Sequence, residues 1–594
     1  MDFHQTDKLK LTLPTGIVGF LRRPVLSPNT LILILSLVIG IATGLGAVLF
    51  RLMITEVEAI LTPISQALSG SIGWLPPTIG LVLAALVVGP IIHFFSSEAK
   101  GHGVPEVMAA VALEGGRIRR RVAVAKIIAS ALCIGSGGSA GREGPIVQIG
   151  SAIGSAVGQF SKMSNRRMRV LVACGAAGGI SAVFNAPIAG VMFSVEIILG
   201  DFAIESLTPV VLSSVLASVT TGFFMAGKSA FQVPPYELVS AYEIPLYILL
   251  GVVGGAMSVF YTRVLYLVED FFDGLKKIPF YFRPALGALG LGLLAIAFPQ
   301  ILADGYHGIS DALMGRLPWT LLLLLPFMKI LATSLTLGSG NSGGVFAPSL
   351  FIGAMVGGAF GVGAHTLWPA VTAHPGAYAL VGMATLVAGA THAPITAILI
   401  IFEMTNDYRI ILPLMIAAAI STFISSRIFK ESIYTLKLSR RGINIRQGRE
   451  VNVLTSVKVH EVMEPPRALI PSTMPLTEVL DRVTQARGSV YPVVDKSERL
   501  TGVISLTDLR EVLRESWGEH TRLLIIAQDV ATVDPVTITP GENLNDAMKK
   551  FGKWDMAEIP VVDPDHDGRL VGMVRRSEVI SAYNRALLSE ERGS

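Results

Sequence analysis

Charged side chains are scarce in this sequence. Asp, Glu, Lys and Arg make up 15% of its 594 residues, whereas 51% of the residues are hydrophobic. Soluble globular proteins carry about a quarter of their residues as charges, so this composition favours a protein whose main solvent is a lipid bilayer. The net charge is only +4, and the basic residues gather beside apolar segments, which argues against a nucleic-acid-binding surface.

Cysteine is nearly absent as well. Cys133 and Cys174 both lie in apolar stretches, so we expect packing residues rather than a disulfide. No nucleophile–base set, cluster of metal ligands or phosphate-binding loop stands out in the sequence. This argues against an enzyme, and against a required cofactor or bound metal.

Apolar segments dominate residues 31 to 429, and polar breaks separate them. The main segments are Leu31–Leu52, Ile79–Phe94, Tyr247–Val268, Trp319–Leu337, Tyr378–Phe402 and Ile410–Ile428. Several are interrupted by Gly and Pro or are shorter than the roughly 20 residues that a membrane-crossing helix needs. We therefore predict a multi-pass, all-α membrane domain with tilted, broken or re-entrant helices that are buried in protein.

Basic residues flank this apolar region on both sides, namely Lys8, Lys10, Arg22 and Arg23 before it and Arg427, Lys430, Lys437, Arg440 and Arg441 after it. The positive-inside rule places both ends in the cytoplasm. The expected location is the plasma (inner) membrane, and no cleavable signal peptide is needed.

The apolar region contains an internal repeat. Three pairs of segments match in order: His102–Glu106 with His307–Asp311, Gly135–Gly154 with Gly338–Gly357, and Asn185–Glu196 with His392–Glu403. Gly-rich apolar sequence aligns with itself easily, but three ordered matches at nearly one offset argue against chance. We predict duplicated halves at about residues 30–226 and 244–436, with a site at the interface between them.

Each half has a Gly-rich stretch that opens an apolar helix, GREGP at Gly141–Pro145 and GGVFAP at Gly343–Pro348. A helix start exposes unpaired N–H groups and about half a positive elementary charge, and such ends bind anions. Two converging helix starts would form a binding site of backbone N–H groups without a charged side chain, which can release a small anion quickly. The sequence therefore favours anion permeation.

Glu143 is the only carboxylate within these two stretches. It can compete with an anion for the same N–H groups, which makes it a candidate gate and, when protonated, a proton carrier. The alternative is a side chain that only caps its own helix beside Arg142. Glu196 and Glu403 occupy matching positions in later apolar helices, where we expect them to cap or brace buried helix ends.

Together with HGVPE at residues 102–106 and the NAP and HAP segments, these motifs closely resemble the CLC family of chloride channels and chloride/proton exchangers. The resemblance covers about residues 30–436. It implies a homodimer with one pore per subunit, each pore built from two inverted repeats, with Glu143 as the gate. The implied anion-binding residues are His102, Gly103, Val104, Gly144, Val345, Phe346, Ala347 and Tyr434. For Tyr434, an interfacial position in the membrane is the alternative.

Two positions depart from the family pattern. His102 stands where the family motif GSGIP has a serine, and we expect a mostly neutral imidazole that still donates to an anion at pH 7. Ile197 stands where many exchangers carry a glutamate that relays protons. Because isoleucine cannot relay protons, we expect a gated passive chloride channel, with a chloride/proton antiporter as the alternative and a fluoride-selective member as a remote one.

After about Ser439 the composition becomes that of a soluble domain, and a second repeat of about 70 residues appears. Tyr491–Asp495 and Gly502–Leu509 match Ile559–Asp563 and Gly572–Val579, and helical stretches at Leu476–Arg487 and Leu544–Gly552 precede them. This looks like a tandem CBS-domain pair, which in the family is cytoplasmic and often binds adenine nucleotides. Thr507 and Asp508 match the place where such modules hold a ribose and a phosphate. We expect a structural module that braces a dimer, with nucleotide binding as the alternative.

The predicted organisation is a cytoplasmic N-terminal segment (1–29), an anion-permeation domain (30–436), a linker (437–455) and a soluble α/β CBS regulatory pair (456–590). CBS pairs also follow the membrane domains of some magnesium transporters, so a divalent-cation transporter is a further alternative. Such a protein should line its path with carboxylates.

Overall fold

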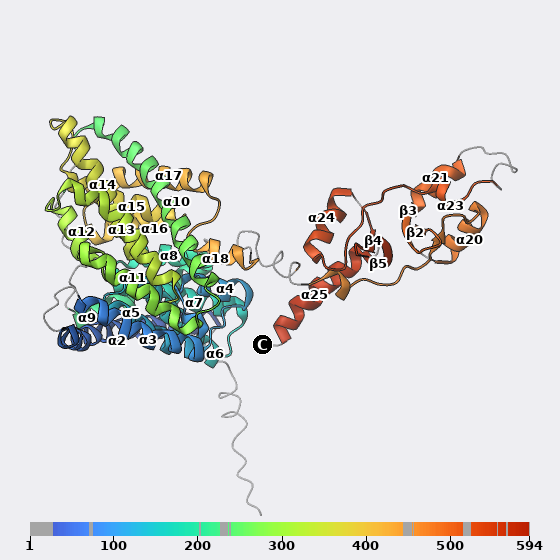
Figure 1. Ribbon diagram of the computed structural model, residues 1–594. Coiled ribbons are helices and arrows are strands. Elements are labelled where there is room, and N and C mark those ends of the chain that lie inside the picture. Colours follow the sequence, from blue (N-terminus) through green and yellow to red (C-terminus); the bar gives the residue numbers. More distant parts are fainter. Residues whose placement is uncertain are drawn as a thin grey trace, which may run out of the picture. The chain divides into compact units, whose positions relative to one another are not determined.

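The computed structural model describes residues 28–69, 75–200, 204–225, 236, 239–443, 454, 457–486, 488–514, 524–554, 556–565 and 568–592. The chain divides into two compact units after Arg441, one of helices and one of mixed helices and strands (Figure 1). The predicted segment 1–29, except its last two residues, and most of the predicted linker lie outside the described residues.

Among the described residues, each half of the helical unit contributes eight α-helices that correspond in order. The first half contains α2 (Pro28–Ser69), α3 (Leu75–Pro90), α4 (Val104–Leu113), α5 (Arg120–Gly135), α6 (Glu143–Phe160), α7 (Asn165–Phe184), α8 (Pro187–Phe193) and α9 (Ile204–Met225). The second contains α10 (Ile244–Gly274), α11 (Arg283–Ala297), α12 (Tyr306–Leu313), α13 (Trp319–Gly338), α14 (Phe346–Leu367), α15 (Pro375–Thr391), α16 (Pro394–Thr405) and α17 (Ile411–Ile428). Corresponding helices make corresponding contacts, since α6 packs on α7 as α14 packs on α15. This confirms the duplication.

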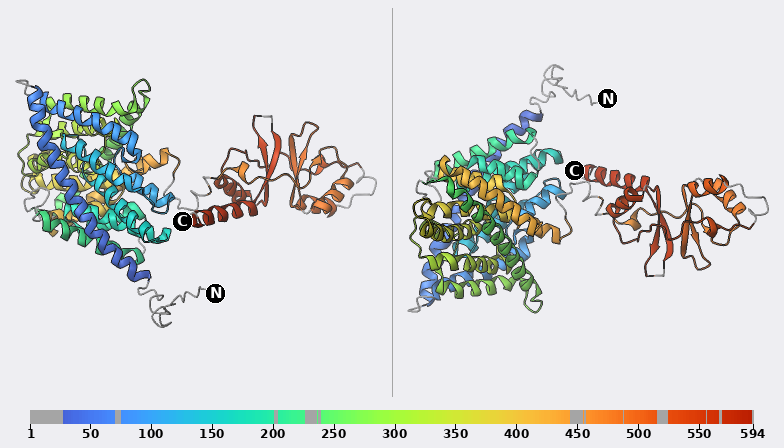
Figure 2. Two further views of the ribbon diagram at one scale, coloured as in Figure 1. Left: turned by 90° about the horizontal axis from the view of Figure 1, so that it is seen from below. Right: turned by 90° about the horizontal axis from the view of Figure 1, so that it is seen from above.

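Short 3-10 or π-helical turns join these helices, namely η1 (Ile91–Phe95), η2 (Ser97–Ala99), η3 (Ser194–Leu199), η4 (Ala241–Glu243), η5 (Phe280–Phe282), η6 (Pro299–Ile301) and η7 (Tyr408–Ile410). Nine helical segments among the described residues are long and apolar enough to cross a membrane; the one in α2 is the dark blue helix that crosses the unit in Figure 2. The apolar stretch Tyr378–Phe402 is broken at His392, which has a φ of 58°. Asn185, with a φ of 53°, breaks the first half at the matching place, so the helices are interrupted as predicted.

The centre of the helical unit is formed by α6, α7, α14 and α15, whose residues are mostly buried. Glycines let these helices approach closely. Gly150 of α6 faces Gly175 of α7, and Gly353 of α14 faces Gly382 of α15. A Cβ atom at any of the four would overlap a backbone carbonyl of the partner glycine. The two halves therefore use the same close packing at matching positions.

The helical unit continues past the predicted boundary at residue 436. A last helix, α18 (Thr435–Arg440), buries Lys437 and Leu438. The Nζ atom of Lys437 lies 3.2 Å from Oε1 of Glu106 in α4. The predicted start of the linker at residue 437 is therefore corrected, because this ion pair holds α18 in the helical unit.

The second unit repeats the order helix, strand, strand, helix, as predicted. The first copy has α20 (Leu476–Ala486), β2 (Val490–Val494), β3 (Leu500–Ser505) and α21 (Leu506–Arg514), and the second has α24 (Leu544–Trp554), β4 (Glu558–Asp563), β5 (Arg569–Arg575) and α25 (Arg576–Arg592). Each strand pair is antiparallel with one register shift, and Figure 2 shows the two pairs side by side. The short elements η9 (Val459–Glu461), β1 (Ile470–Pro471) and α23 (Ala527–Val530) complete this unit. Strand β1, which the sequence does not indicate, pairs in parallel with β2.

We expect Gly353→Ala to lower the unfolding temperature of the detergent-solubilised protein. The new Cβ atom would overlap the carbonyl of Gly382 and push α14 away from α15, and overpacking of this kind costs about 1–3 kcal/mol. Gly363→Ala is the matched control, because it changes the same helix where no described atom lies within 4 Å of the new Cβ. Equal unfolding temperatures for the two variants would contradict the prediction.

Candidate functional site

Two helix starts, one from each half, meet inside the helical unit. Helix α6 begins at Glu143 and α14 begins at Phe346, as the two Gly-rich stretches predict. Two backbone hydrogen bonds join them, from Gly141 N to the Gly344 carbonyl (2.8 Å) and from Gly344 N to the Gly141 carbonyl (2.6 Å). The unpaired N–H groups of both helices therefore lie close to one small region.

Glycine is required where these helix starts meet. A Cβ atom at Gly144 would overlap the carbonyl oxygen of His102, and one at Gly344 would lie 2.8 Å from Gly144 N. His102 stands just before α4, whose N-cap is Gly103 with a φ of 80°. The start of a third helix therefore lies against the same place, and this brings Gly103 and Val104 to the other predicted anion-binding residues.

Glu143 is 1% exposed, and its carboxylate reaches the helix start of the opposite half. Oε2 accepts a hydrogen bond from the backbone N–H of Ala347 in α14 (3.3 Å). Oε1 accepts one from the hydroxyl of Tyr306 (2.7 Å). The carboxylate thus takes an N–H group that an anion could use. A side chain that only capped its own helix would not make this contact.

Nothing in the sequence singles out Tyr306. It is the first residue of α12, and its counterpart in the first half is Gly101. Lys329 holds the preceding loop, because its Nζ donates to the carbonyls of Ile301 (2.8 Å) and Ala303 (2.9 Å). Only the tertiary contact with Glu143 reveals that Tyr306 belongs to the site.

His102 and Tyr434 are both buried, and their ring centroids lie 6.2 Å apart. Among the described residues, Nδ1 of His102 has no hydrogen-bond partner and is available to a ligand. Lys126 holds the loop before His102 through hydrogen bonds to the carbonyls of Ala99 (3.0 Å) and Gly101 (2.6 Å). The burial of Tyr434 argues against the interfacial alternative, since an interfacial tyrosine keeps its hydroxyl in contact with water.

The remaining predicted site residues of the helical unit are apolar and buried. Val345 is the N-cap of α14, and the ring of Phe346 packs at 5.5 Å from that of Phe184. Ile197 is buried in η3. By contrast, His307, the counterpart of His102, is exposed and lines a cavity of about 730 Å³. The duplicated histidines therefore have different surroundings.

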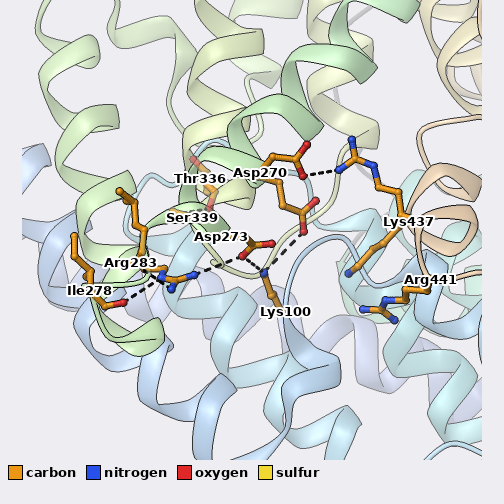
Figure 3. Close-up of polar contacts among 12 residues, drawn as sticks. Lys100, Asp270, Asp273, Ile278, Arg283, Thr336, Ser339, Lys437 and Arg441 are labelled. Atoms are coloured by element: carbon orange, nitrogen blue, oxygen red, sulfur yellow. Dashed lines mark hydrogen bonds and ion pairs between the residues drawn. The ribbon is translucent and has the colours of Figure 1, made fainter. Parts of the chain in front are cut away.

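Ion pairs surround the loop that leads to His102. Figure 3 shows Lys100 and Arg283 directed at Asp273 near the end of α10, at N–O distances of 3.3 and 3.7 Å. Arg440 of α18 pairs with Asp270 of α10 at 2.6 Å. These contacts connect α10, α11 and α18 with the loop that carries predicted anion-binding residues.

Glu196, in the first half, binds a helix start in the second half, and Glu403, in the second half, binds one in the first. Glu403 in α16 accepts hydrogen bonds from two N–H groups at the start of α8, including that of Ala189 (2.7 Å). Glu196 in η3 accepts two from the start of α16, including that of Thr396 (2.8 Å). The expectation that these carboxylates brace helix ends is confirmed.

Residues 84–426 match the sequence family described as voltage-gated chloride channel. The chain belongs to this family, the CLC family. Residues 459–515 and 527–585 each match the CBS domain. The H(+)/Cl(-) exchange transporter ClcA of Vibrio parahaemolyticus is 33% identical over 420 residues, which are 69% of this chain and 89% of ClcA. CLC-e of Arabidopsis thaliana is 32% identical over 528 residues, with coverage of 78% and 74%.

Solved structures agree with this assignment. A slow cyanobacterial Cl-/H+ antiporter matches with a TM-score of 0.65 and 27% identity, covering 70% of this chain and 98% of its own. A eukaryotic CLC transporter matches 92% of this chain and 97% of its own with a TM-score of 0.60, and at 23% identity it shows the fold alone.

The predicted fold class, a polytopic helical membrane domain followed by a CBS pair, is confirmed. The protein is thus a multi-span anion transport protein of a family of channels and transporters rather than enzymes.

We expect Glu403→Gln to lower the free energy of unfolding while anion flux stays within about twofold of the wild type. The neutral amide weakens the bonds to two N–H groups at the start of α8, and hydrogen bonds to a charged group contribute about 1.5–3 kcal/mol. The substitution leaves the helix starts around Glu143 untouched. Denaturation in detergent and chloride efflux from liposomes measure the two effects, and reduced flux at unchanged stability would refute the bracing role.

Proposed function

We propose that the protein exchanges chloride for protons across a membrane, with Glu143 as both the anion gate and a proton carrier. The observation that carries this proposal is the hydrogen bond between its carboxylate and the N–H of Ala347, because the carboxylate then stands where a permeating anion would bind. While ionised, it blocks the anion. Once protonated, it loses the charge that the helix starts attract, so the neutral side chain swings away and takes its proton with it.

Exchange replaces the passive channel that Ile197 favours in the sequence. The Vibrio relative is named an H(+)/Cl(-) exchange transporter, and the cyanobacterial structure is that of a Cl-/H+ antiporter. Because Ile197 is a buried hydrocarbon side chain, protons that leave Glu143 need water or another carboxylate on the remaining path. A passive channel is the second candidate, and this missing relay is the observation that favours it.

In this proposal the anion is bound by helix starts rather than by fixed charges. That arrangement suits a small anion such as chloride, whereas a divalent cation needs a path lined by carboxylates. A CLC-type fluoride/proton antiporter also matches, at a TM-score of 0.59 and 24% identity, which supports the fold and not the choice of fluoride. The proposed anion-binding residues are His102, Gly103, Val104, Gly144, Val345, Phe346, Ala347 and Tyr434.

The proposed assembly is a homodimer with one pore per subunit, both termini in the cytoplasm, and a regulatory CBS pair. Within that pair, Thr507 is exposed and Asp508 Oδ2 accepts a hydrogen bond from Ser505 N (2.7 Å) at the start of α21. We propose Thr507 and Asp508 as the contact for an adenine nucleotide. Asp508 would then have both a capping and a binding role.

Adding AMP to the purified full-length protein should raise its unfolding temperature, because a ligand that binds only the folded state stabilises it. Thr507→Val should reduce this rise and leave the unfolding temperature without AMP unchanged, since the Thr507 side chain is exposed. Absence of any AMP effect on the wild type would reject the nucleotide site and favour a purely bracing CBS pair.

The exchange proposal is tested with protein reconstituted in liposomes that carry an outward chloride gradient. We expect chloride efflux to drive protons inward against their gradient, so the external pH rises. With a potassium ionophore present to clamp the voltage, chloride efflux without proton movement would identify a passive channel. If chloride does not move at all, the anion proposal itself is rejected.

Glu143→Gln should keep chloride flux but abolish proton coupling and flatten the pH dependence of flux, because an amide cannot exchange a proton or compete as a charge for the Ala347 N–H. Glu403→Gln is the control, since it removes the charge of another membrane carboxylate that binds backbone N–H groups. Coupled, pH-dependent flux in the Glu143→Gln protein would reject the role of Glu143.

A further inference from the structure

We propose that Tyr306 is a positioning residue for the gate: its hydroxyl holds the ionised carboxylate of Glu143 in the closed position and sets the pH at which the gate opens. This inference rests on the proposed role of Glu143. It assigns to α12, in the second half, direct control over a gate carried by the first half.

The closed position depends on two donors from the second half. The Tyr306 hydroxyl donates to Oε1 of Glu143 at 2.7 Å, and the N–H of Ala347 donates to Oε2 at 3.3 Å. Both side chains are buried, with Tyr306 7% and Glu143 1% exposed. Each carboxylate oxygen thus has its own donor, and opening must break both bonds.

Tyr306 itself is held in place from several sides. Its backbone N–H donates to Oδ1 of Asp304 (3.3 Å). In the same loop, Ala303 N donates to the carbonyl of Gly137 (2.9 Å), which ties the loop to the first half. The guanidinium of Arg142 lies 5.0 Å from the centroid of the Tyr306 ring. With its ring and backbone both restrained, the tyrosine presents its hydroxyl to Glu143 at small entropic cost.

The hydroxyl favours one protonation state of the gate. A hydrogen bond to an ionised acceptor is about twice as strong as one to a neutral acceptor, and burial strengthens it further. The bond from Tyr306 therefore stabilises the closed, ionised gate more than the protonated gate. Removing the hydroxyl should let the gate open at a higher pH.

Other charged or titratable groups interact with the Glu143 carboxylate or line the cavity beside Tyr306, namely Arg142, Asp304, Tyr434, Arg51, Glu58 and His307. Among them, His307 lines the same cavity as Tyr306. If His307 caused the pH dependence of flux, removing the Tyr306 hydroxyl would not change it. The test therefore includes variants at both Tyr306 and His307.

Tyr306→Phe removes only the hydroxyl. In liposomes, we expect the pH of half-maximal chloride flux to rise by about one unit and flux at pH 7 to rise several-fold. Tyr378→Phe is the matched control, because it also removes a buried tyrosine–glutamate hydrogen bond, to Oε1 of Glu243 (2.9 Å), at a place outside the anion site. It should leave the pH profile unchanged. His307→Gln combined with Tyr306→Phe should show the same upward shift.

The Glu143→Gln background separates this inference from the proposed function. In that background, Tyr306→Phe should change neither the flux nor its pH profile, because Tyr306 acts only through the Glu143 carboxylate. Full flux in the double variant would show that the fold is intact. A wild-type profile in Tyr306→Phe, with altered gating in Glu143→Gln, would overturn the role of Tyr306 alone. No effect of Glu143→Gln would instead reject the gate. Reduced flux at every pH in both backgrounds would make Tyr306 a purely structural residue.

Discussion

The proposed anion site depends on the close approach of two helix starts. The paired backbone hydrogen bonds between Gly141 and Gly344 hold α6 against α14, and no side chain larger than hydrogen fits at Gly144 or Gly344. Because the N–H groups of a helix start have no partner within their own helix, this approach concentrates donors without placing a fixed positive charge there. The carboxylate of Glu143 accepts a hydrogen bond from one of these donors, which is the basis of the proposed gate.

The residues that hold the loops and helices around this contact occur in matching pairs, one in each half. Lys126 and Lys329 hold the loops before α4 and α12 in the same way, each by donating to two backbone carbonyls. Glu196 and Glu403 each bind the helix start of the other half. Lys126 and Lys329 are fully buried, whereas Glu196 and Glu403 are half-buried. All four bind backbone groups, and a membrane interior favours this because unpaired polar groups are costly there. The shared frame thus holds both halves in matching positions.

The proposed function depends on positions where the two halves differ. The counterpart of Glu143 is Phe346, so only one half carries the carboxylate that we propose as the gate. The counterpart of Tyr306 is Gly101, so only the other half supplies a hydroxyl to that carboxylate. His102 is buried next to Tyr434, whereas His307 is exposed at a cavity. The two halves therefore share one arrangement of helices but differ in the side chains at the proposed gate, where a tyrosine from one half donates to the glutamate of the other.

The sequence by itself determined the membrane class, the duplication, the helix starts at GREGP and GGVFAP, and the two CBS copies, because apolar segments, glycine and proline act locally and leave repeating patterns. It also marked Glu143, since a lone carboxylate in an anion cradle is unusual. Only the tertiary structure decided which donors this carboxylate meets, because Tyr306 lies 163 residues away and nothing in its local sequence indicates the contact. The same holds for α18, which belongs to the helical unit because Lys437 meets Glu106 from a distant helix.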